Sequence, residues 1–314
     1  MGTQISKPTH GSLKWLEVRH RDEQGKIRFG ASEAPILMGV SKYQTLTDLA
    51  LAKWSDPEVK EQNDAMVRGT VLEPALLDFA SQVLGVKVTT PEVMYAQGRF
   101  IATLDGVTEA GSTIVEAKTT TAYSCDDPMP VEFFWQAVAQ LACTDAEAVR
   151  FVVLDKRMRL AMPNHWVVYR DNVEDEIIQL EEVAEQVGQA LDARKLPDGA
   201  TMTETHVKML YPDSHGTKEL GTDGIVAVNE WQAARDAREY AEQIEREARD
   251  RLTAMLGEAE VGTVDGQKVV SYKSRSTGSR LDTKQLELDY PDLVAKYKKP
   301  AGTTRVLRSS LDGK

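Results

Sequence analysis

The hydrophobic period of the chain changes near residue 85, and this change constrains the fold more than any other feature of the sequence. From Val71 to Val83, apolar residues recur every three or four positions, which predicts a helix that ends at Gly85, with Pro74 in its first turn. From Val86 to Thr120, three runs rich in β-branched residues alternate with period two and are separated by turn residues. We expect these runs to form an antiparallel meander.

The other segments continue this mixture of helices and strands. Helical spacing of apolar residues, or a capping residue, predicts helices at residues 46–54, 131–144, 173–191 and 226–256 and a short one after Asp282. Apolar β-rich runs predict strands at residues 150–155, 165–170, 268–273 and 303–308, with a hairpin turn at Asp265–Gly266. A charged connector is expected at residues 55–64. The fold class is therefore α/β.

Length and composition set the expected domain organisation. The chain has 314 residues, of which 41% are hydrophobic and 28% charged, so it can bury a sizeable core. Residues 195–224 are rich in Pro, Gly, Asp and Thr, as in a linker or an extended crossover. We expect a core domain at residues 1–200, a linker at 201–224 and a helical and small β extension at 225–314.

Cysteine usage and hydropathy exclude several classes of protein. Cys125 and Cys143 are the only cysteines, too few for a disulfide-stapled scaffold or a four-cysteine iron–sulfur cluster. No run approaches the roughly 18 to 20 apolar residues that cross a bilayer, and the N-terminus lacks the apolar run of a signal peptide. We expect a cytoplasmic protein with no membrane partner.

The net charge of −11 hides an asymmetry along the chain. From Val261 to Ser310, ten basic residues stand against five acidic ones, so the acidic excess lies in residues 1–260. A basic region of this kind indicates a polyanionic ligand, or equally a face that docks on an acidic part of the same chain or of a neighbour.

Asp105 and the triplet Glu116-Ala117-Lys118 form the constellation best suited to chemistry, because they end two neighbouring β-runs. Two carboxylates can hold hard cations such as Mg²⁺, and Lys118 projects to the same strand face as Glu116. Such a lysine can orient a water molecule or neutralise charge on a phosphate. The spacing alone is weak, since Glu58 and Lys60 share it, and the alternative is a salt bridge on an edge strand.

These residues resemble the PD-(D/E)XK nuclease motif, with Leu104 in place of the usual proline. The chain is similar, more specifically, to the YqaJ-type viral recombinase, or phage lambda exonuclease-like, family over residues 12–195. Four further segments carry this resemblance: residues 15–19, residues 30–33 with 39–41, residues 68–74 and residues 134–140. The resemblance implies a restriction-endonuclease-like core, with a mixed central sheet flanked by helices.

The resemblance also implies roles for single residues. Glu73, Asp105, Glu116 and the Ala117 carbonyl would ligate one or two Mg²⁺, for which Mn²⁺ would substitute. Lys118 would position water, Gln136 would brace the site, and Arg19 and Ser32 would grip a terminal 5′-phosphate. The chain departs from relatives that carry an arginine shortly after the lysine, because residues 119–124 contain none.

The function implied is a 5′-to-3′ exonuclease that degrades double-stranded DNA ends and leaves 3′ single strands for recombination, in the cytoplasm of a bacterial host. Expected partners are a single-strand annealing protein and further copies of the chain in a homo-oligomeric ring, a trimer or tetramer. Two alternatives remain: a non-catalytic DNA clamp or recombination scaffold of the same fold, and a site-specific endonuclease.

Overall fold

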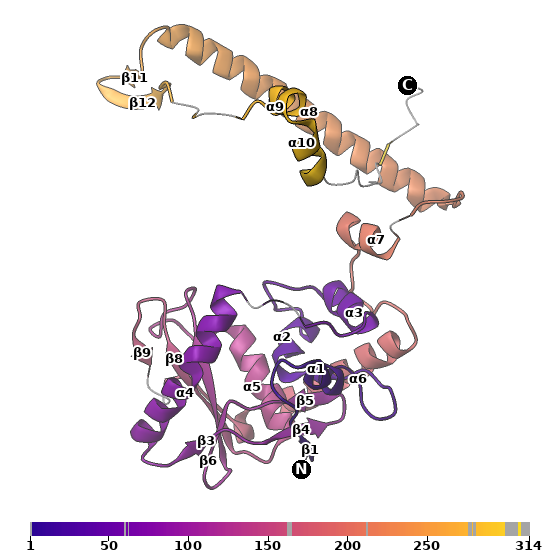
Figure 1. The fold of residues 1–314 in the computed structure, drawn as a ribbon, viewed down its shortest axis with the longest axis vertical. Coiled ribbons are helices and arrows are strands. Elements are labelled where there is room, and N and C mark those ends of the chain that lie inside the picture. Colours follow the sequence, from indigo (N-terminus) through magenta and orange to yellow (C-terminus); the bar gives the residue numbers. More distant parts are fainter. Residues whose placement is uncertain are drawn as a thin grey trace. The chain divides into compact units, whose positions relative to one another are not determined.

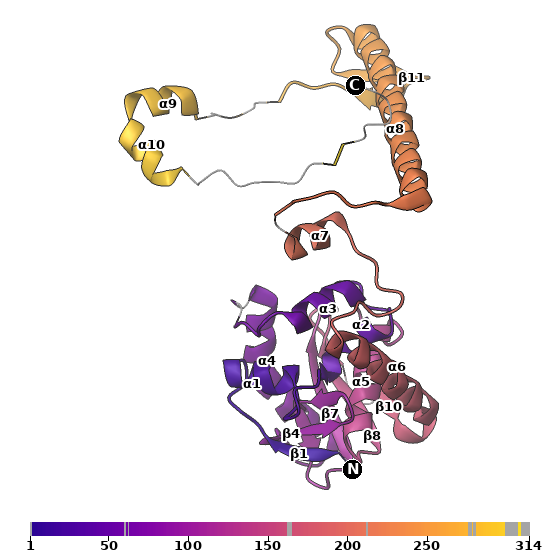
Figure 2. The ribbon, with the colours of Figure 1, turned by 90° about the vertical axis from the view of Figure 1, so that its right-hand side faces the viewer.

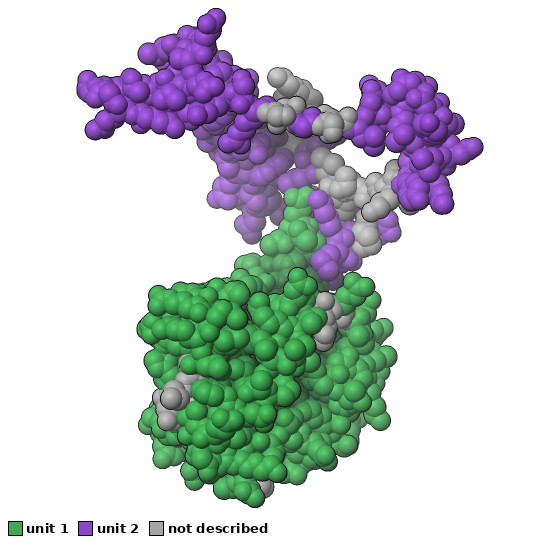
Figure 3. Space-filling view, turned by 60° about the vertical axis from the view of Figure 1, so that its left-hand side comes forward, with its two compact units in different colours: residues 1–206 green, residues 207–314 purple. Residues whose placement is uncertain are grey.

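The computed structural model describes residues 2–59, 61, 63–161, 165–211, 213–275, 278, 281–298 and 307–308. The chain divides into two compact units, residues 1–206 and residues 207–314 (Figure 3). Cys125 and Cys143 are both free and buried. Among the described residues, none of the helices combines the length and the apolar character that crossing a membrane requires.

The first unit contains ten short strands and six α-helices in the residues that the structure describes (Figure 1). The strands are β1 (Thr3–Ser6), β2 (Phe29–Gly30), β3 (Val88–Thr89), β4 (Val93–Gln97), β5 (Phe100–Ala102), β6 (Gly106–Thr108), β7 (Thr113–Thr119), β8 (Ala148–Leu154), β9 (Leu160–Ala161) and β10 (Val167–Tyr169). The α-helices are α1 (Leu13–His20), α2 (Ala34–Leu37), α3 (Leu46–Trp54), α4 (Asp64–Leu84), α5 (Val131–Cys143) and α6 (Glu174–Asp192).

The strands form two sheets, and the larger one is mixed. Its order is β10-β8-β7-β6-β3, with β9 paired to β8; β7 and β8 run parallel, and the other pairs are antiparallel. The smaller sheet has the order β1-β4-β5-β2. The expected α/β core with a mixed sheet flanked by helices is confirmed.

The expectation of one continuous meander from Val86 to Thr120 is wrong. β4 and β5 belong to the smaller sheet, whereas β6 and β7 belong to the larger one, so the chain changes sheets at residues 103–105. Leu104 enters the main core there and is 1% exposed. The Asp105 side chain accepts a hydrogen bond from the Ala117 backbone N–H, which replaces the ladder bond that a continuing strand would make.

The two faces of the larger sheet are covered by different helices (Figure 1). Val115 and Ala117 of β7 pack with α4, whereas Ile114, which precedes Val115, lies in the main core, to which α5 contributes. α6 packs beside α5 (Figure 2). Because side chains alternate along a strand, Glu116 and Lys118 lie on the α5 face of β7.

Two N-terminal features differ from the sequence predictions. α4 begins at Asp64 rather than near Val71, with the Asn63 side chain as its cap, so Pro74 lies in the helix interior. The first 20 residues, for which no helix or strand was predicted, contain β1 and α1, because β1 pairs with β4 and Trp15 of α1 packs against the smaller sheet. These tertiary contacts stabilise segments whose local pattern is weak.

α7 (Glu204–Leu210) crosses the boundary between the two units. The second unit continues with α8 (Gly221–Leu256), the hairpin strands β11 (Val261–Val264) and β12 (Gln267–Ser271), α9 (Thr283–Asp289) and α10 (Pro291–Tyr297). The α8 helix, the turn at Asp265–Gly266 and the Asp282 cap agree with the sequence predictions. The strand expected at residues 303–308 lies outside the described residues, except for Leu307 and Arg308.

Candidate active site

Glu116 and Lys118 lie on a central strand, not on an edge strand. β7 has β6 on one side and β8 on the other, so the edge-strand salt bridge considered above does not describe this pair. Glu116 is 3% exposed, and Lys118 Nζ lies 2.7 Å from its Oε1. The structure thus places a buried carboxylate and a half-buried ammonium group in the middle of a sheet.

Two glutamines on α5 fix both oxygens of Glu116. Gln136 Nε2 donates to Oε1 and Gln140 Nε2 donates to Oε2 of the carboxylate. Lys118 Nζ also donates to Gln136 Oε1 at 2.9 Å. Gln140 was not singled out from the sequence; the signal that could have found it is its position four residues after Gln136, which places both on one helix face.

Asp105 lies in the segment between β5 and β6 and lines the same cavity as Glu116. The Ala117 N–H donates to Asp105 Oδ2 at 2.9 Å. The N–H and C=O of one residue in a strand point toward the same edge, so the Ala117 carbonyl is directed to the Asp105 side of β7. This is the side on which the resemblance implies a metal.

Three carboxylates share one cavity of about 370 Å³. Glu73 reaches it from α4, Asp105 from the sheet break and Glu116 from β7. Gln136 also lines this cavity. Lys118 donates hydrogen bonds to Glu116 and Gln136, two of the residues that line it. The structure therefore brings together the predicted residues from segments that are far apart in the sequence.

Burial and neighbouring charges shift the pKa values of Glu73, Asp105 and Lys118. Burial raises the pKa of Glu73 above its ordinary value, and the Glu116 charge raises it further. The pKa of Asp105 is raised well above its ordinary value by burial and by Glu116. Burial acts to lower the pKa of Lys118, but Glu116 and Asp105 more than offset this, so its pKa is raised. The neighbouring ammonium groups do not offset these effects, because the pKa values of Glu73 and Asp105 remain raised.

The donor set fits a hard divalent cation in chemistry and charge. Carboxylate and carbonyl oxygens are the ligands that Mg²⁺ prefers, and an added cation would relieve the repulsion described above. No group of three or more His, Cys, Asp or Glu side chains in the described ranges is already arranged to hold a metal. To bind a cation, Glu116 would have to give up some of the hydrogen bonds that it accepts from Lys118, Gln136 and Gln140.

Arg19 and Ser32 line the same cavity. Arg19 Nη2 donates to Ser32 Oγ at 3.2 Å, and the guanidinium lies 4.3 Å from the ring centroid of Trp15. Gly30 leaves the space that Arg19 needs, because a Cβ at this position would come within 2.1 Å of Nη2. The pair is therefore positioned by packing, at the same cavity as the carboxylates.

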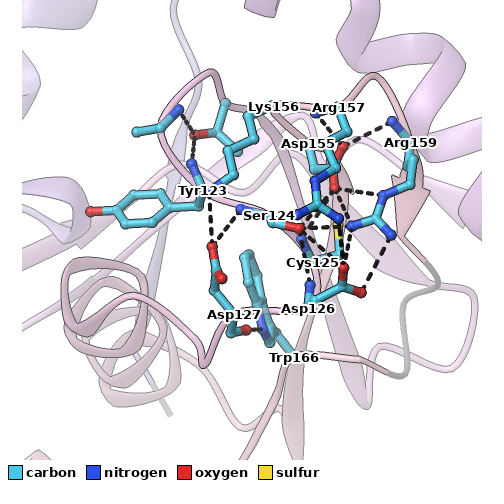
Figure 4. Close-up of polar contacts among 12 residues, drawn as sticks. Tyr123, Ser124, Cys125, Asp126, Asp127, Asp155, Lys156, Arg157, Arg159 and Trp166 are labelled. Atoms are coloured by element: carbon cyan, nitrogen blue, oxygen red, sulfur yellow. Dashed lines mark hydrogen bonds and ion pairs between the residues drawn. The ribbon is translucent and has the colours of Figure 1, made fainter. Parts of the chain in front are cut away.

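A second cavity, of about 390 Å³, is lined by Lys118, Gln136, Ser32 and the segment that follows β7. Asp155 anchors that segment (Figure 4). Its buried carboxylate accepts from the Cys125 N–H at 3.2 Å and from the Arg159 guanidinium at 2.9 Å. This network fixes the wall of the second cavity.

Gly106 allows β6 to lie close under α4, directly after Asp105. A Cβ at Gly106 would come 2.6 Å from Val88 Cγ1 and 2.9 Å from Leu77 Cδ2. We expect Gly106→Ala to lower the free energy of unfolding by about 1–3 kcal/mol through overpacking. Urea denaturation measures this, with Gly69→Ala as the control, since its nearest neighbouring atom is 4.0 Å away. Equal stability of the two variants would contradict the prediction.

The chain is similar to several known proteins. Residues 14–147 match the model of the YqaJ-like viral recombinase domain. The "Uncharacterized protein YqaJ" of Bacillus subtilis (strain 168) is 23% identical over 299 residues, which cover 91% of this chain and 90% of that protein. The alkaline exonuclease LHK-Exo from Laribacter hongkongensis has a TM-score of 0.44 and 21% identity, covering 58% of this chain and 94% of that one.

A phage-related exonuclease from Haemophilus somnus 129PT has a TM-score of 0.43 and 11% identity, with 54% of this chain and 96% of that one covered. The family model spans the segments that contribute Arg19, Ser32, Glu73, Asp105 and Glu116 to the cavity. Residues 14–147 thus match the YqaJ-like viral recombinase domain, the family that the sequence motifs resemble.

Proposed function

We propose that the chain is a Mg²⁺-dependent deoxyribonuclease that hydrolyses linear duplex DNA from its 5′ ends. The observation that carries the proposal is the single cavity in which Glu73, Asp105 and Glu116 meet Arg19 and Ser32. Carboxylates suit a divalent cation, and a guanidinium beside a hydroxyl suits a phosphate. The family match supports a nucleic-acid substrate.

The residues of the chain have distinct parts in the proposed reaction. Glu73, Asp105, Glu116 and the Ala117 carbonyl would hold one or two Mg²⁺, or Mn²⁺, which supplies charge stabilisation at the attacking and leaving oxygens. Lys118 orients the attacking water: two of its three N–H groups are directed to Glu116 and Gln136, which leaves the third for water.

In this proposal, Arg19 and Ser32 determine that digestion starts at the 5′ end of a strand. A terminal 5′-phosphate held by them would place the adjacent phosphodiester at the carboxylates, so the 5′ strand is shortened and a 3′ single strand remains. A single-strand annealing protein would receive that strand. A homo-oligomeric ring, a trimer or tetramer around DNA, would keep the enzyme on its substrate.

Digestion of end-labelled DNA tests the proposal. We expect the wild type to remove nucleotides from 5′-phosphorylated linear duplex in Mg²⁺ and not in EDTA, and to leave covalently closed circles intact. Cleavage of closed circles would identify an endonuclease instead. Binding to linear DNA without cleavage, in Mg²⁺ or Mn²⁺, would identify a non-catalytic clamp or scaffold.

The C-terminal extension is expected to guide DNA or to bind the annealing protein, because residues 261–310 carry ten basic and five acidic residues. Deletion of residues 225–314 should then reduce the number of nucleotides removed per binding event, or abolish partner binding. Single-turnover digestion with a competitor DNA trap and a pull-down with the annealing protein measure these effects. Wild-type behaviour in both assays would reject this role.

A further inference from the structure

Helix α8 carries an apolar stripe that the described part of the chain leaves exposed (Figure 1). The stripe consists of residues that recur at helical spacing: Val226, Ala234, Ala237, Ala241, Ile244, Ala248, Leu252 and Met255. α8 is described along its whole length, and none of its residues is buried. Ile244 and Leu252 are nearly half exposed, and Met255 is 83% exposed. Helices in proteins gain most of their stability by packing such a face, so the stripe calls for a partner.

The spacing of the stripe is that of a two-stranded coiled coil. Residues seven positions apart take position a of a heptad: Ala234, Ala241, Ala248 and Met255. Ala237 and Ile244 follow an a residue by three positions and take position d. Apolar residues at a and d form the seam between two helices, and the residues at the flanking e and g positions set the partner and its direction.

The e positions favour an antiparallel second copy of α8. In an antiparallel pair, an a residue faces a d residue of the other helix, and e residues face e residues. Placing Ala241 opposite Ile244 of a second copy sets Arg238 opposite Glu245. The two-fold axis repeats this contact of opposite charges, and the same alignment sets Trp231 opposite Leu252.

Other alignments of the two helices lack this match. A shift by one heptad in either direction sets Arg238 opposite itself or Glu245 opposite itself, so that like charges meet. A parallel pair would place g residues against e residues five positions later, which sets Ala233 against Arg238 and Tyr240 against Glu245. Neither of these parallel contacts joins opposite charges.

Arg238 and Glu245 can reach a second copy. Their side chains are both 67% exposed. Arg238 pairs with Glu242 of the same helix at 3.5 Å, and Glu245 pairs with Arg249. Exposed ion pairs four residues apart are weak, so these pairs do not prevent a contact across the seam.

The two charged residues at the outer d positions are compatible with the same alignment. Arg251 would face Ala234 of the second copy, whose small side chain leaves room for the aliphatic stem while the guanidinium reaches water. Glu230 would lie one helical turn from Arg251 of the second copy, which carries the opposite charge.

We propose that α8 pairs antiparallel with α8 of a second copy of the chain, in the alignment that sets Arg238 opposite Glu245. The pairing joins two copies through their C-terminal extensions and closes on itself, because the same surface is used on both. It goes beyond the proposed function and does not require a ring: where a ring also forms, the pairing joins two rings and doubles the mass.

Charge reversal in the full chain tests the pairing. Sedimentation equilibrium is expected to show that Arg238→Glu and Glu245→Arg each weaken association about tenfold or more, because each sets like charges opposite each other twice. The double variant Arg238→Glu/Glu245→Arg restores opposite charges and should associate within about threefold of the wild type. Arg246→Glu and Glu239→Arg are the matched controls: both residues occupy position f, away from the seam, and their variants should associate like the wild type.

Disulfide cross-linking tests the direction of the pair. Ala237→Cys/Ala248→Cys is expected to form a covalent dimer on oxidation, because the two positions face each other across an antiparallel seam. Ala234→Cys alone should remain uncross-linked, since its copies lie about 26 Å apart in this alignment and would meet only in a parallel pair. The wild type is the background control, because Cys125 and Cys143 are buried.

Far-UV circular dichroism verifies that each variant keeps its helices. The inference is overturned if the folded single reversals associate like the wild type, if the double variant does not recover, or if Ala234→Cys cross-links instead of Ala237→Cys/Ala248→Cys. Digestion of linear duplex DNA in Mg²⁺ decides the nuclease proposal separately, because none of the substituted residues lines the cavity that holds the carboxylates.

Discussion

Replacing Asp105 with asparagine is expected to reduce cleavage of linear duplex DNA about 1000-fold or more, and at the same time to raise the thermal midpoint of the protein in EDTA. Activity falls because one of the three carboxylates that would hold the cation is lost. Stability rises because burial and Glu116 raise the pKa of Asp105, so the ionised carboxyl destabilises the folded state above its unfolded pKa. The amide oxygen can still accept from the Ala117 N–H.

Initial digestion rates in Mg²⁺ and thermal melts in EDTA measure the two effects. Asp78→Asn is the control, because Asp78 lies on the exposed face of α4 and does not line the cavity. It should keep wild-type activity. Substantial digestion by Asp105→Asn would contradict the assigned role, and a lowered midpoint would show that the loss of activity comes from unfolding.

Arg99→Met is expected to have the largest effect on stability. The Arg99 side chain is 6% exposed, and its nitrogens lie 2.9 Å from Glu185 and 2.7 Å from Asp192. It also donates to the Ile27 carbonyl at 3.3 Å, so it ties the turn between β4 and β5 to α6. Removing one partner of a buried ion pair costs about 3–5 kcal/mol; because Glu185 is half exposed, we expect about 2–3 kcal/mol here.

Urea denaturation of Arg99→Met measures this loss, and Arg157→Met is the control because its ion pair with Asp126 is exposed. The pH dependence provides a second check. The Arg99 guanidinium lowers the pKa of Glu185 to about 2, so this stabilisation is fully present above the unfolded pKa of about 4.5 and is lost as the pH falls toward 2.

Arg99→Met should therefore lose less stability than the wild type between pH 4.5 and pH 2.5. Parallel pH profiles of the two proteins would contradict the assignment, and a variant as stable as the wild type at pH 7 would show that the pair contributes nothing. Arg99→Lys, which keeps one charge but not the guanidinium fork, should fall between them.

Local patterns were enough to predict part of the site. The period-two pattern places Glu116 and Lys118 on one strand face, and the contact between their charged groups agrees with it. The spacing of Phe134, Val138 and Leu141 defines α5, the helix that carries Gln136. These features depend on side-chain alternation over a few residues, which the sequence displays directly.

Other features depend on contacts between distant segments. The exchange of sheets at residues 103–105 depends on the burial of Leu104 and on the bond between Asp105 and the Ala117 N–H. Gln140 reaches Glu116 only because α5 packs against β7. No short-range pattern encodes such contacts.

By itself, the sequence determined the α/β class, the helix and strand types around the site and the resemblance of residues 14–147 to the YqaJ-like viral recombinase domain, because periodicity, capping residues and motif spacing are local properties. Only the tertiary structure decided that Glu73, Asp105, Glu116 and Arg19 share one cavity, and that Lys7 and His10 join them there. The reason is physical: the pairing of β1 with β4 and the burial of Trp15 are long-range interactions, and they bring these charges together at a cost that packing elsewhere offsets.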